Sequence, residues 1–377
     1  MFPGGRGICR QIRLSRGFVH AKTFPTPVLQ RSQIASLPCP LVRRVFALAL
    51  AGWAVVTPLI LAAAPVAGWE IAKIEGRDYV SVESMKRFYN FTKLTRSGSS
   101  IVLENAKVEM KLKLGGNECL MNGVKFVFTY AVASIGDKAY VSRMDLAKLI
   151  DPVLRPNFIK NAGDFRTVIL DPGHGGKDPG ATNSLGNEAT YNLKIASQVK
   201  SMLQAQGFKV VMTRDSDRFL SLQERVDLAN AIRENAIFVC IHFNSGGREA
   251  RGIETFTLSP PGVSHYGRDA IAADNQVRVG NEHDSANIAL ATSVHGSILR
   301  RLQKNTFDRG IKHARFSVLS GVRHPAILLE GGFLTHPYEA RLIENEKYQY
   351  ALVKGIVEAI AKYRFAVGTK PAGNGSN

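Results

Sequence analysis

Hydrophobic and polar positions follow two different patterns along this 377-residue chain. Between residues 69 and 155, apolar side chains recur at every second position in short segments, a spacing that predicts β-strands. A strand followed by a short helix is expected twice, at 78–91 and at 138–150. Further strands are expected between these two units, at 100–103, 107–114 and 124–130. We therefore predict a small α+β domain over residues 68–157.

A linker is expected next, at 158–165, in a stretch punctuated by Pro152, Pro156 and Gly163. After it, near-continuous apolar strands alternate with amphipathic helices. The strands are expected at 166–171, 208–213, 236–242, 252–258 and 325–330, and the helices at 189–206, 221–235, 285–303 and 348–365. Apolar strands separated by helices indicate a parallel sheet that is covered on both faces.

The predicted fold of residues 166–365 is therefore α/β, with an open, mostly parallel twisted sheet and helices on both faces. The small α+β domain precedes it. Residues 366–377 contain Gly, Pro and Ser and few large apolar side chains, so we expect a disordered tail there.

The N-terminal 67 residues have a composition of their own. They hold eight of the 49 Lys and Arg residues and none of the 31 Asp and Glu residues. An uncharged apolar run at 45–64 follows Arg43 and Arg44 and precedes small residues, which is typical of a signal peptide. A run of this length is also long enough for an uncleaved membrane anchor. We assign 41–67 to this signal peptide or anchor, and interpret 1–40 as a leader from an over-extended translation start.

Export to the periplasm or cell envelope is the expected localisation, and membrane attachment is expected only if the segment 45–64 stays uncleaved. The net charge of +18 favours an anionic partner, either a nucleic acid, an acidic lipid or an acidic wall polymer. An export signal and the lack of a recognisable nucleic-acid module argue against the first of these. Four cysteines without a CxxC pair predict no disulfide framework, and Cys240 in an apolar strand is expected to be buried.

Polar residues follow the carboxyl ends of several predicted strands. His174 follows the first strand, His242 ends the third and Glu330 ends the last. Glu188 precedes the first helix, which the topology returns to the same edge of the sheet, where ligands bind in such folds. Two imidazoles and one carboxylate form a typical catalytic zinc site with a position left for water. The second carboxylate would then accept and return a proton.

Five sequence blocks carry a resemblance to a known family. They are residues 171–181, the region of Glu188, and residues 221–225, 241–245 and 329–334. Together they resemble the zinc-dependent N-acetylmuramoyl-L-alanine amidases over residues 166–364. The resemblance implies one Zn²⁺ held by His174, Glu188 and His242, with Glu330 as the catalytic carboxylate. Phe243 departs from the small residue usual in the family, and Gly332 is a second departure.

The reaction that this resemblance implies is hydrolysis of the amide bond between the muramic acid lactyl group and L-alanine in peptidoglycan. Its setting would be cell-wall turnover or cell separation. Residues 68–157 are weakly similar to stalk domains that resemble the N-terminal domain of copper amine oxidases, but they contain no histidine. Some family members carry an insertion that plugs the site until an activator binds. The corresponding residues 260–284 lack an obvious long helix, so no plug is expected, while an activator protein stays a candidate partner.

Two further residues are candidates for substrate contact, Asn244 and Arg225, although Arg225 fits an internal ion pair better. The remaining histidines of the second domain are expected to be surface or packing residues, with His283 and His336 nearest the cleft.

The sequence disfavours two other classes of function. A different secreted zinc hydrolase is disfavoured because the chain has no HExxH motif. A non-catalytic wall-binding protein is disfavoured because all four site residues are intact.

Overall fold

The computed structural model describes residues 68–160 and 162–368. All of these residues belong to one compact unit. The expected leader (1–40) and the signal or anchor segment (41–67) lie outside the described residues. Of the helices within the described ranges, none is both long and apolar enough to cross a bilayer.

The N-terminal part contains nine short strands and one helix before residue 143. Their bounds are β1 Ile71–Ile74, β2 Arg77–Ser81, α1 Val82–Phe88, β3 Lys93–Ser97, β4 Ser100–Glu104, β5 Glu109–Lys113, β6 Glu118–Met121, β7 Val124–Val127, β8 Ala133–Ile135 and β9 Lys138–Ser142. Strands β1, β2, β9 and β8 form one antiparallel sheet, while β7 to β3 form an antiparallel meander. Helix α1 begins at Ser81 because the side chain of Ser81 accepts a hydrogen bond from the amide of Ser84.

A run of helical turns follows, made of α2 Arg143–Asp145, the π-helical η1 Leu146–Ile150, α3 Asp151–Leu154 and the 3-10 turn η2 Pro156–Phe158. The strands predicted at 78–82, 100–103, 107–114, 124–130 and 138–142 all exist with small shifts at their ends. Strands β1, β3, β6 and β8 were not predicted, because each has only three to five residues.

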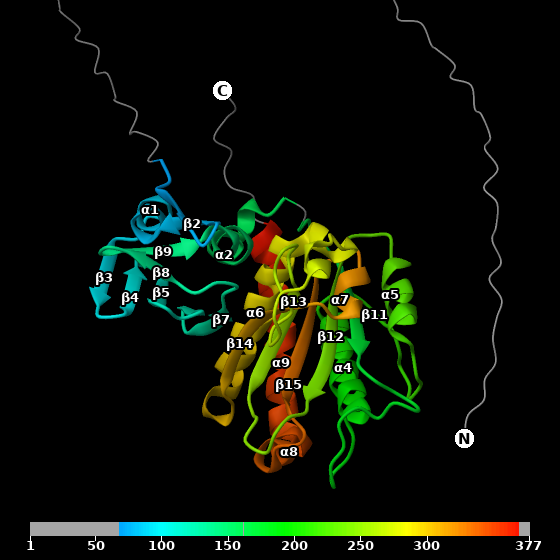
Figure 1. Ribbon diagram of the computed structural model, residues 1–377. Helices are drawn as coiled ribbons and strands as arrows, with labels where there is room; N and C mark the ends of the chain where they lie inside the picture. Colours follow the sequence, from blue (N-terminus) through cyan, green and yellow to red (C-terminus); the bar gives the residue numbers. More distant parts are fainter. Residues whose placement is uncertain (1–67, 161, 369–377) are drawn as a thin grey trace, which may run out of the picture. The chain divides into compact units, whose positions relative to one another are not determined.

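The C-terminal part is built around six strands. The bounds are β10 Thr167–Pro172, α4 Glu188–Ala205, β11 Lys209–Met212, α5 Leu222–Asn230, β12 Ala236–Asn244, β13 Ile253–Leu258, α6 Asp284–Leu302, β14 Asp308–Ala314, α7 Ser317–Gly321, β15 Ala326–Phe333, α8 Pro337–Glu344 and α9 Glu346–Gly368, with 3-10 turns at η3 Ala272–Asn275, η4 Val279–His283 and η5 Gln303–Asn305. The strand order is β11-β10-β12-β15-β13-β14 (Figure 1). Every neighbouring pair among these is parallel except β13 and β15. The predicted α/β fold with a mostly parallel sheet is confirmed.

Helices cover both faces of this sheet, which explains why its central strands β10, β12 and β15 are mostly apolar. Val168 of β10 packs in the core that α4, α6 and α9 build on one face. Its neighbour Ile169 points the other way and packs with residues of α5 and α7. Successive side chains of a strand alternate between faces, so a sheet buried on both sides needs an apolar residue at nearly every position.

Two sequence expectations need correction. Strand β14 lies in a stretch without a predicted element, because its sequence Asp308-Arg-Gly-Ile-Lys-His-Ala314 is mostly polar although most of its residues are buried. The final helix α9 runs to Gly368, so the first three residues of the predicted tail are helical. The rest of that tail, 369–377, lies outside the described residues.

Strand β14 also joins the two parts of the chain. Ile311 of β14 pairs in parallel with Phe126 of β7, and the amide of Lys125 donates to Asp308 Oδ2 at 2.7 Å. The six strands of the C-terminal part and the five-stranded meander of the N-terminal part therefore form one 11-stranded sheet. The chain between them, predicted as a linker, connects parts that share a sheet.

Candidate active site

The turn after β10 holds the first histidine in an unusual backbone conformation. His174 has φ = 59°, in the left-handed region that non-glycine residues rarely occupy. Gly173 precedes it, and a Cβ on Gly173 would lie 2.1 Å from Cε1 of His242. Only a glycine at position 173 lets the two imidazoles come together, with ring centroids 4.9 Å apart.

Glu188 is the first residue of α4 and lies between the two histidines. Its Oε1 is 3.2 Å from His174 Nε2 and 2.7 Å from His242 Nδ1. Asn187 is the N-cap of α4 and accepts a hydrogen bond from the amide of Thr190. This cap fixes the first turn of the helix and with it the backbone position of Glu188. One ligand atom from each of His174, Glu188 and His242 lies within 4.8 Å of the others. The structure therefore brings together the three residues that the sequence assigned to a metal.

The charges in this cluster suit a cation. Burial alone would raise the pKa of Glu188, but its hydrogen bonds with His174 and His242 outweigh burial and hold that pKa well below the usual range. The same hydrogen bond to Glu188 is the largest cause that raises the pKa of His174. The Glu188 carboxylate is therefore ionised, and its negative charge attracts a cation. Two imidazole nitrogens and one carboxylate oxygen at this spacing fit a zinc ion with one position left open.

Glu330 lies on the strand beside His242. The two residues are register partners on the parallel strands β12 and β15, and Glu254 of β13 is the partner of Glu330 on its other side. His242, Glu330 and Glu254 thus form a row across one face of the sheet. Glu330 Oε2 is buried and has no hydrogen-bond partner among the described residues. Burial, followed by the charges of Glu188 and Glu254, raises the pKa of Glu330 well above its usual range.

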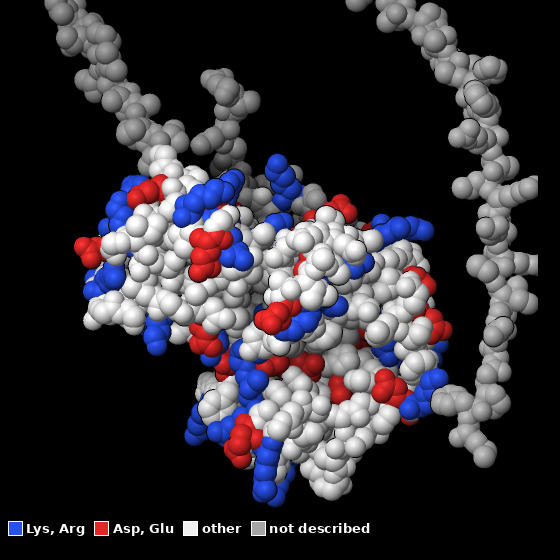
Figure 2. Space-filling view, viewed as in Figure 1, with Lys and Arg blue, Asp and Glu red and all other residues white. Residues whose placement is uncertain are grey.

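The row lies in a depression. Figure 2 shows a hollow on this side of the molecule, over the central strands, with acidic side chains gathered inside it. Helices α5 and α7 pack on the apolar residues nearer the other end of the same face, and the side chains of His174 and His242 are 26% and 18% exposed. A substrate can therefore reach the histidines and Glu330 from solvent.

Comparison with known proteins identifies the family. The profile described as N-acetylmuramoyl-L-alanine amidase (Amidase_3) matches residues 168–362, which is more than half of the chain. The chain belongs to the N-acetylmuramoyl-L-alanine amidase family. It is a peptidoglycan amidase.

The chain is also similar to individual proteins. The protein YqiI of Bacillus subtilis (strain 168) is 33% identical over 198 residues, which are 52% of this chain and 84% of the relative. The N-acetylmuramoyl-L-alanine amidase AmiC of Neisseria meningitidis serogroup B is 31% identical over 240 residues, which cover 58% of this chain and only 57% of AmiC. A crystal structure of an N-acetylmuramoyl-L-alanine amidase from Clostridium difficile 630 matches with 34% identity and a TM-score of 0.45, over 55% of this chain and all of that one.

The two candidate substrate contacts have different surroundings in the amidase. Asn244 is half-buried beside the row of site residues and donates to Glu254 Oε2 at 3.0 Å. Arg225 is only 3% exposed and forms a buried ion pair with Asp171 at 2.7 Å. This geometry favours the internal ion pair that the sequence also suggested for Arg225. We retain Asn244 alone as a candidate for contact with the substrate.

Two residues of the amidase site were not found from sequence. Asp178 Oδ2 lies 2.8 Å from His174 Nδ1, which leaves Nε2 of that ring for a metal. The sequence did contain a signal for Asp178, because this acid follows the proposed ligand His174 by four residues and lies within the family block 171–181. Glu254 could also have been noticed as the one charged residue in the apolar strand β13. Its importance depends on its pairing with Glu330, which no sequence pattern indicates.

The departure at Phe243 does not disturb the ligands. Phe243 points to the opposite face of the sheet from His242, where it is buried in the core and its ring meets that of Tyr191 edge to face. A Cβ on Gly331 would lie 2.9 Å from the Phe243 ring. The glycine after Glu330 therefore makes room for the large side chain.

Residues 260–284 lie away from the amidase site. They follow β13, which runs antiparallel to β15. The segment therefore begins at the end of the strands that lies opposite to the end with Glu330. Asn281 donates to the carbonyl of Ser259 there.

Neither histidine that was expected nearest the cleft lines it. His283 belongs to the 260–284 segment, and its Nε2 lies 2.8 Å from the carbonyl oxygen of Arg323. His336 is buried and caps α8 by accepting from the amides of Tyr338 and Glu339. The cleft expectation was wrong for His283 because β13 reverses direction relative to its neighbour β15.

Proposed function

We propose that the amidase acts with one Zn²⁺, held by His174, Glu188 and His242, and that Glu330 moves the proton in the reaction. The observation that carries the proposal is the convergence of three ligand atoms within 4.8 Å next to a carboxyl group that is in register with one of them. A zinc ion bound there would supply Lewis acidity toward the scissile carbonyl and the attacking water.

The first task of the protein is to orient the ligands. Asp178 accepts from His174 Nδ1 and so fixes the tautomer that presents Nε2. The amides of Ala181 and Phe243 donate to the two carboxylate oxygens of Glu188 at 2.9 and 3.2 Å. These contacts hold the carboxylate in place and keep it charged.

The second task falls to Glu330. Its Oε2 has no hydrogen-bond partner among the described residues, so the atom is available to accept a proton from water. The same group can then return the proton to the amine of L-alanine as that amine leaves. Burial and two neighbouring carboxylates make Glu330 a stronger base than an exposed glutamate, which suits both steps near neutral pH.

We further propose the setting of the reaction. The apolar segment at 45–64 would export the enzyme to the periplasm or cell envelope, or anchor it there if it is not cleaved. Residues 68–377 hold 41 Lys and Arg against 31 Asp and Glu, and this net charge of +10 would hold the enzyme on acidic wall polymers. The role would be wall turnover or cell separation, with peptidoglycan as substrate and an activator protein as a candidate partner.

The experiment is hydrolysis of purified peptidoglycan, followed through the release of new L-alanine amino termini. Wild type, Glu330→Gln and the exposed-loop control Glu249→Gln are compared with zinc and with a chelator, and bound zinc is measured for each. We expect zinc-dependent release by wild type and Glu249→Gln. Glu330→Gln should retain zinc but lose activity by at least ~10²-fold.

Other outcomes are equally informative. Activity that survives complete removal of metal would overturn the zinc assignment. Full activity in Glu330→Gln would remove Glu330 from the mechanism. New amino termini other than L-alanine would keep the metal site but point to a different secreted hydrolase. Zinc binding without any cleavage would support a wall-binding role or an activator requirement.

A further inference from the structure

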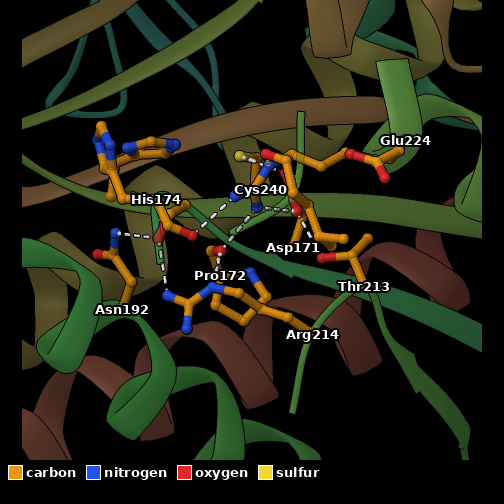
Figure 3. A network of polar contacts seen from close by, with 12 residues as sticks. Asp171, Pro172, His174, Asn192, Thr213, Arg214, Glu224 and Cys240 are labelled. Atoms are coloured by element: carbon orange, nitrogen blue, oxygen red, sulfur yellow. Dashed lines mark hydrogen bonds and ion pairs between the residues drawn. The ribbon is translucent and has the colours of Figure 1, made fainter. Parts of the chain in front are cut away.

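Three successive backbone carbonyls lead into the metal site, those of Pro172, Gly173 and His174. Each of them accepts a hydrogen bond from a buried guanidinium group, supplied by Arg214 or Arg225. Figure 3 shows Pro172, Arg214 and the neighbouring polar side chains converging under this turn. Neither arginine has a place in the chemistry proposed above.

Arg214 follows β11 and is completely buried. Its Nε donates to the carbonyl of Pro172 at 2.8 Å, and its Nη2 donates to the carbonyls of Gly173 and Ala189, both at 2.8 Å. Ala189 is the second residue of α4, next to Glu188. Arg214 therefore ties the turn that carries His174 to the helix that carries Glu188.

Arg225 lies on α5 and approaches the same turn from another side. Its Nη1 donates to the carbonyl of Pro172 at 2.8 Å, and its Nη2 donates to the carbonyl of His174 at 2.7 Å. Its charge is balanced by Asp171, which is completely buried. Asp171 accepts in addition from Thr213 Oγ1 and Cys240 Sγ, so each of its oxygens has a partner.

The conformation of His174 explains why two arginines bind this turn. We call Arg214 and Arg225, which hold the carbonyls of residues 172–174, the clamp. A non-glycine residue in the left-handed region persists only where its surroundings determine the backbone fully. An arginine side chain offers five donors in a rigid, planar arrangement, so it can hold several carbonyls at fixed relative positions. A lysine carries the same charge but cannot reproduce that arrangement.

We propose that Arg214 and Arg225 are positioning residues of the metal site, which hold the carbonyls of residues 172–174 so that His174 is preorganised toward Glu188 and His242. This inference rests on the proposed zinc site. Without these hydrogen bonds the turn can relax in the metal-free protein. Zinc must then reorder the turn when it binds, and the free energy that this requires lowers the affinity for zinc.

The chain offers a matched control at the opposite edge of the sheet. Arg315 donates to the carbonyls of Pro260, Val263 and Asp274 and pairs with the buried carboxylate of Asp274. It thus resembles Arg225 in its contacts, but it organises the 260–284 segment and touches no site residue. A change at Arg315 reports what loss of such a buried network does to the fold alone.

The test compares Arg214→Lys, Arg225→Lys and Arg315→Lys in the whole protein. Zinc affinity is measured by competition with a chromophoric chelator, the visible spectrum is recorded with Co²⁺ as probe, and the metal-free proteins are unfolded thermally. We expect Arg214→Lys and Arg225→Lys to bind zinc about 10- to 100-fold more weakly with an altered Co²⁺ spectrum. Arg315→Lys should lose stability but bind both metals as wild type does.

The proposal is overturned if the two clamp variants bind zinc as tightly as wild type, or if Arg315→Lys loses affinity to the same extent. If a lysine variant does not fold, Thr213→Val provides a milder change, because it removes only one of the bonds to Asp171, and a smaller loss of affinity is expected. If wild type itself binds no zinc, the proposed metal site has failed rather than the clamp.

Discussion

Glu254 and Glu330 occupy paired positions on the antiparallel strands β13 and β15, so two carboxyl groups lie side by side in the sheet. Their surroundings differ. Glu254 forms ion pairs with Lys312, at 2.7 Å, and with Arg309. Glu330 has no such partner at Oε2 among the described residues. Burial, followed by the charges of Glu188 and Glu254, raises the pKa of Glu330.

This pairing predicts the effect of Glu254→Gln on the pH dependence of hydrolysis. Burial is the largest cause that raises the pKa of Glu330, and the negative charges of Glu188 and Glu254 add to it. Removing the charge of Glu254 therefore lowers that pKa. Since Glu330 must be ionised to accept a proton, the rising limb of the pH profile of kcat/KM should move to lower pH. A shift toward higher pH would show that Glu254 does not act on Glu330 in this way. Glu249→Gln, at an exposed position, should leave the profile unchanged.

Asp178→Asn should weaken zinc binding. The asparagine keeps the size of the side chain but replaces the carboxylate that accepts from His174 Nδ1 at 2.8 Å. We expect zinc affinity to fall about 10- to 100-fold, as measured by chelator competition. Asp217→Asn is the matched control, because Asp217 accepts from the amide of Gly176 in the same turn without touching the ring. Equal losses in both variants would mean that the order of the turn matters, and not the orientation of the imidazole.

Gly173→Ala should separate folding from metal binding. The added methyl group would lie 2.1 and 2.2 Å from two atoms of the His242 ring, so the ring must move away from Glu188. We expect a folded protein, as judged by circular dichroism, that has lost most of its bound zinc and its activity. Gly247→Ala serves as the comparison, because a Cβ there meets no atom within 4 Å. Wild-type zinc content in Gly173→Ala would contradict the packing described for the two histidines.

His313 predicts a pH dependence of stability that is separate from catalysis. It is buried on β14, where its Nδ1 lies 3.1 Å from Thr257 Oγ1, and burial lowers its pKa to about 4. The pKa of an unfolded histidine is about 6.5. Above pH 6.5 the group is neutral in both states and has no effect. Between pH 6.5 and 4 the unfolded chain binds the proton first, so the free energy of unfolding falls by up to ~3 kcal/mol as the pH falls.

His313→Gln should remove this part of the acid sensitivity. Urea unfolding of wild type and variant at pH 7 and pH 4.5 gives the difference directly, and the other histidines cancel because both proteins contain them. The gap between the two proteins should change in favour of the variant as the pH falls. An unchanged gap would show that His313 accepts a proton in the folded protein without cost.

The sequence predicted much of the site because its chemistry follows from topology. The carboxyl ends of parallel strands meet at one edge, so residues as far apart as His174 and His242 could be expected to converge once the strands were recognised. Glu188 followed from the return of α4 to that edge. Topology could not predict that β13 pairs with β15 beside Glu330, because β13 runs antiparallel to β15. Glu254 therefore became part of the site only in three dimensions.

Strand β14 escaped prediction for a related reason. Its buried positions include Lys312 and His313, which read as solvent-exposed residues in a hydrophobicity pattern. Lys312 is tolerated there because Glu254 neutralises it. Arg225 is a related case, because the sequence suggested an internal ion pair but could not identify Asp171 as the partner. Burial of charge depends on partners that lie far away in the chain, and periodicity reports only neighbours.

The pairing of β7 with β14 has a consequence for how the enzyme can be divided. Ile311 of β14 pairs with Phe126, and the carboxylate of Asp308 accepts from the amide of Lys125. A fragment that began at residue 166 would leave this border of the sheet open, with backbone groups free to pair with a second chain. The N-terminal strands therefore cover this border of the sheet, and a shortened chain would present it to other chains as a site for strand pairing.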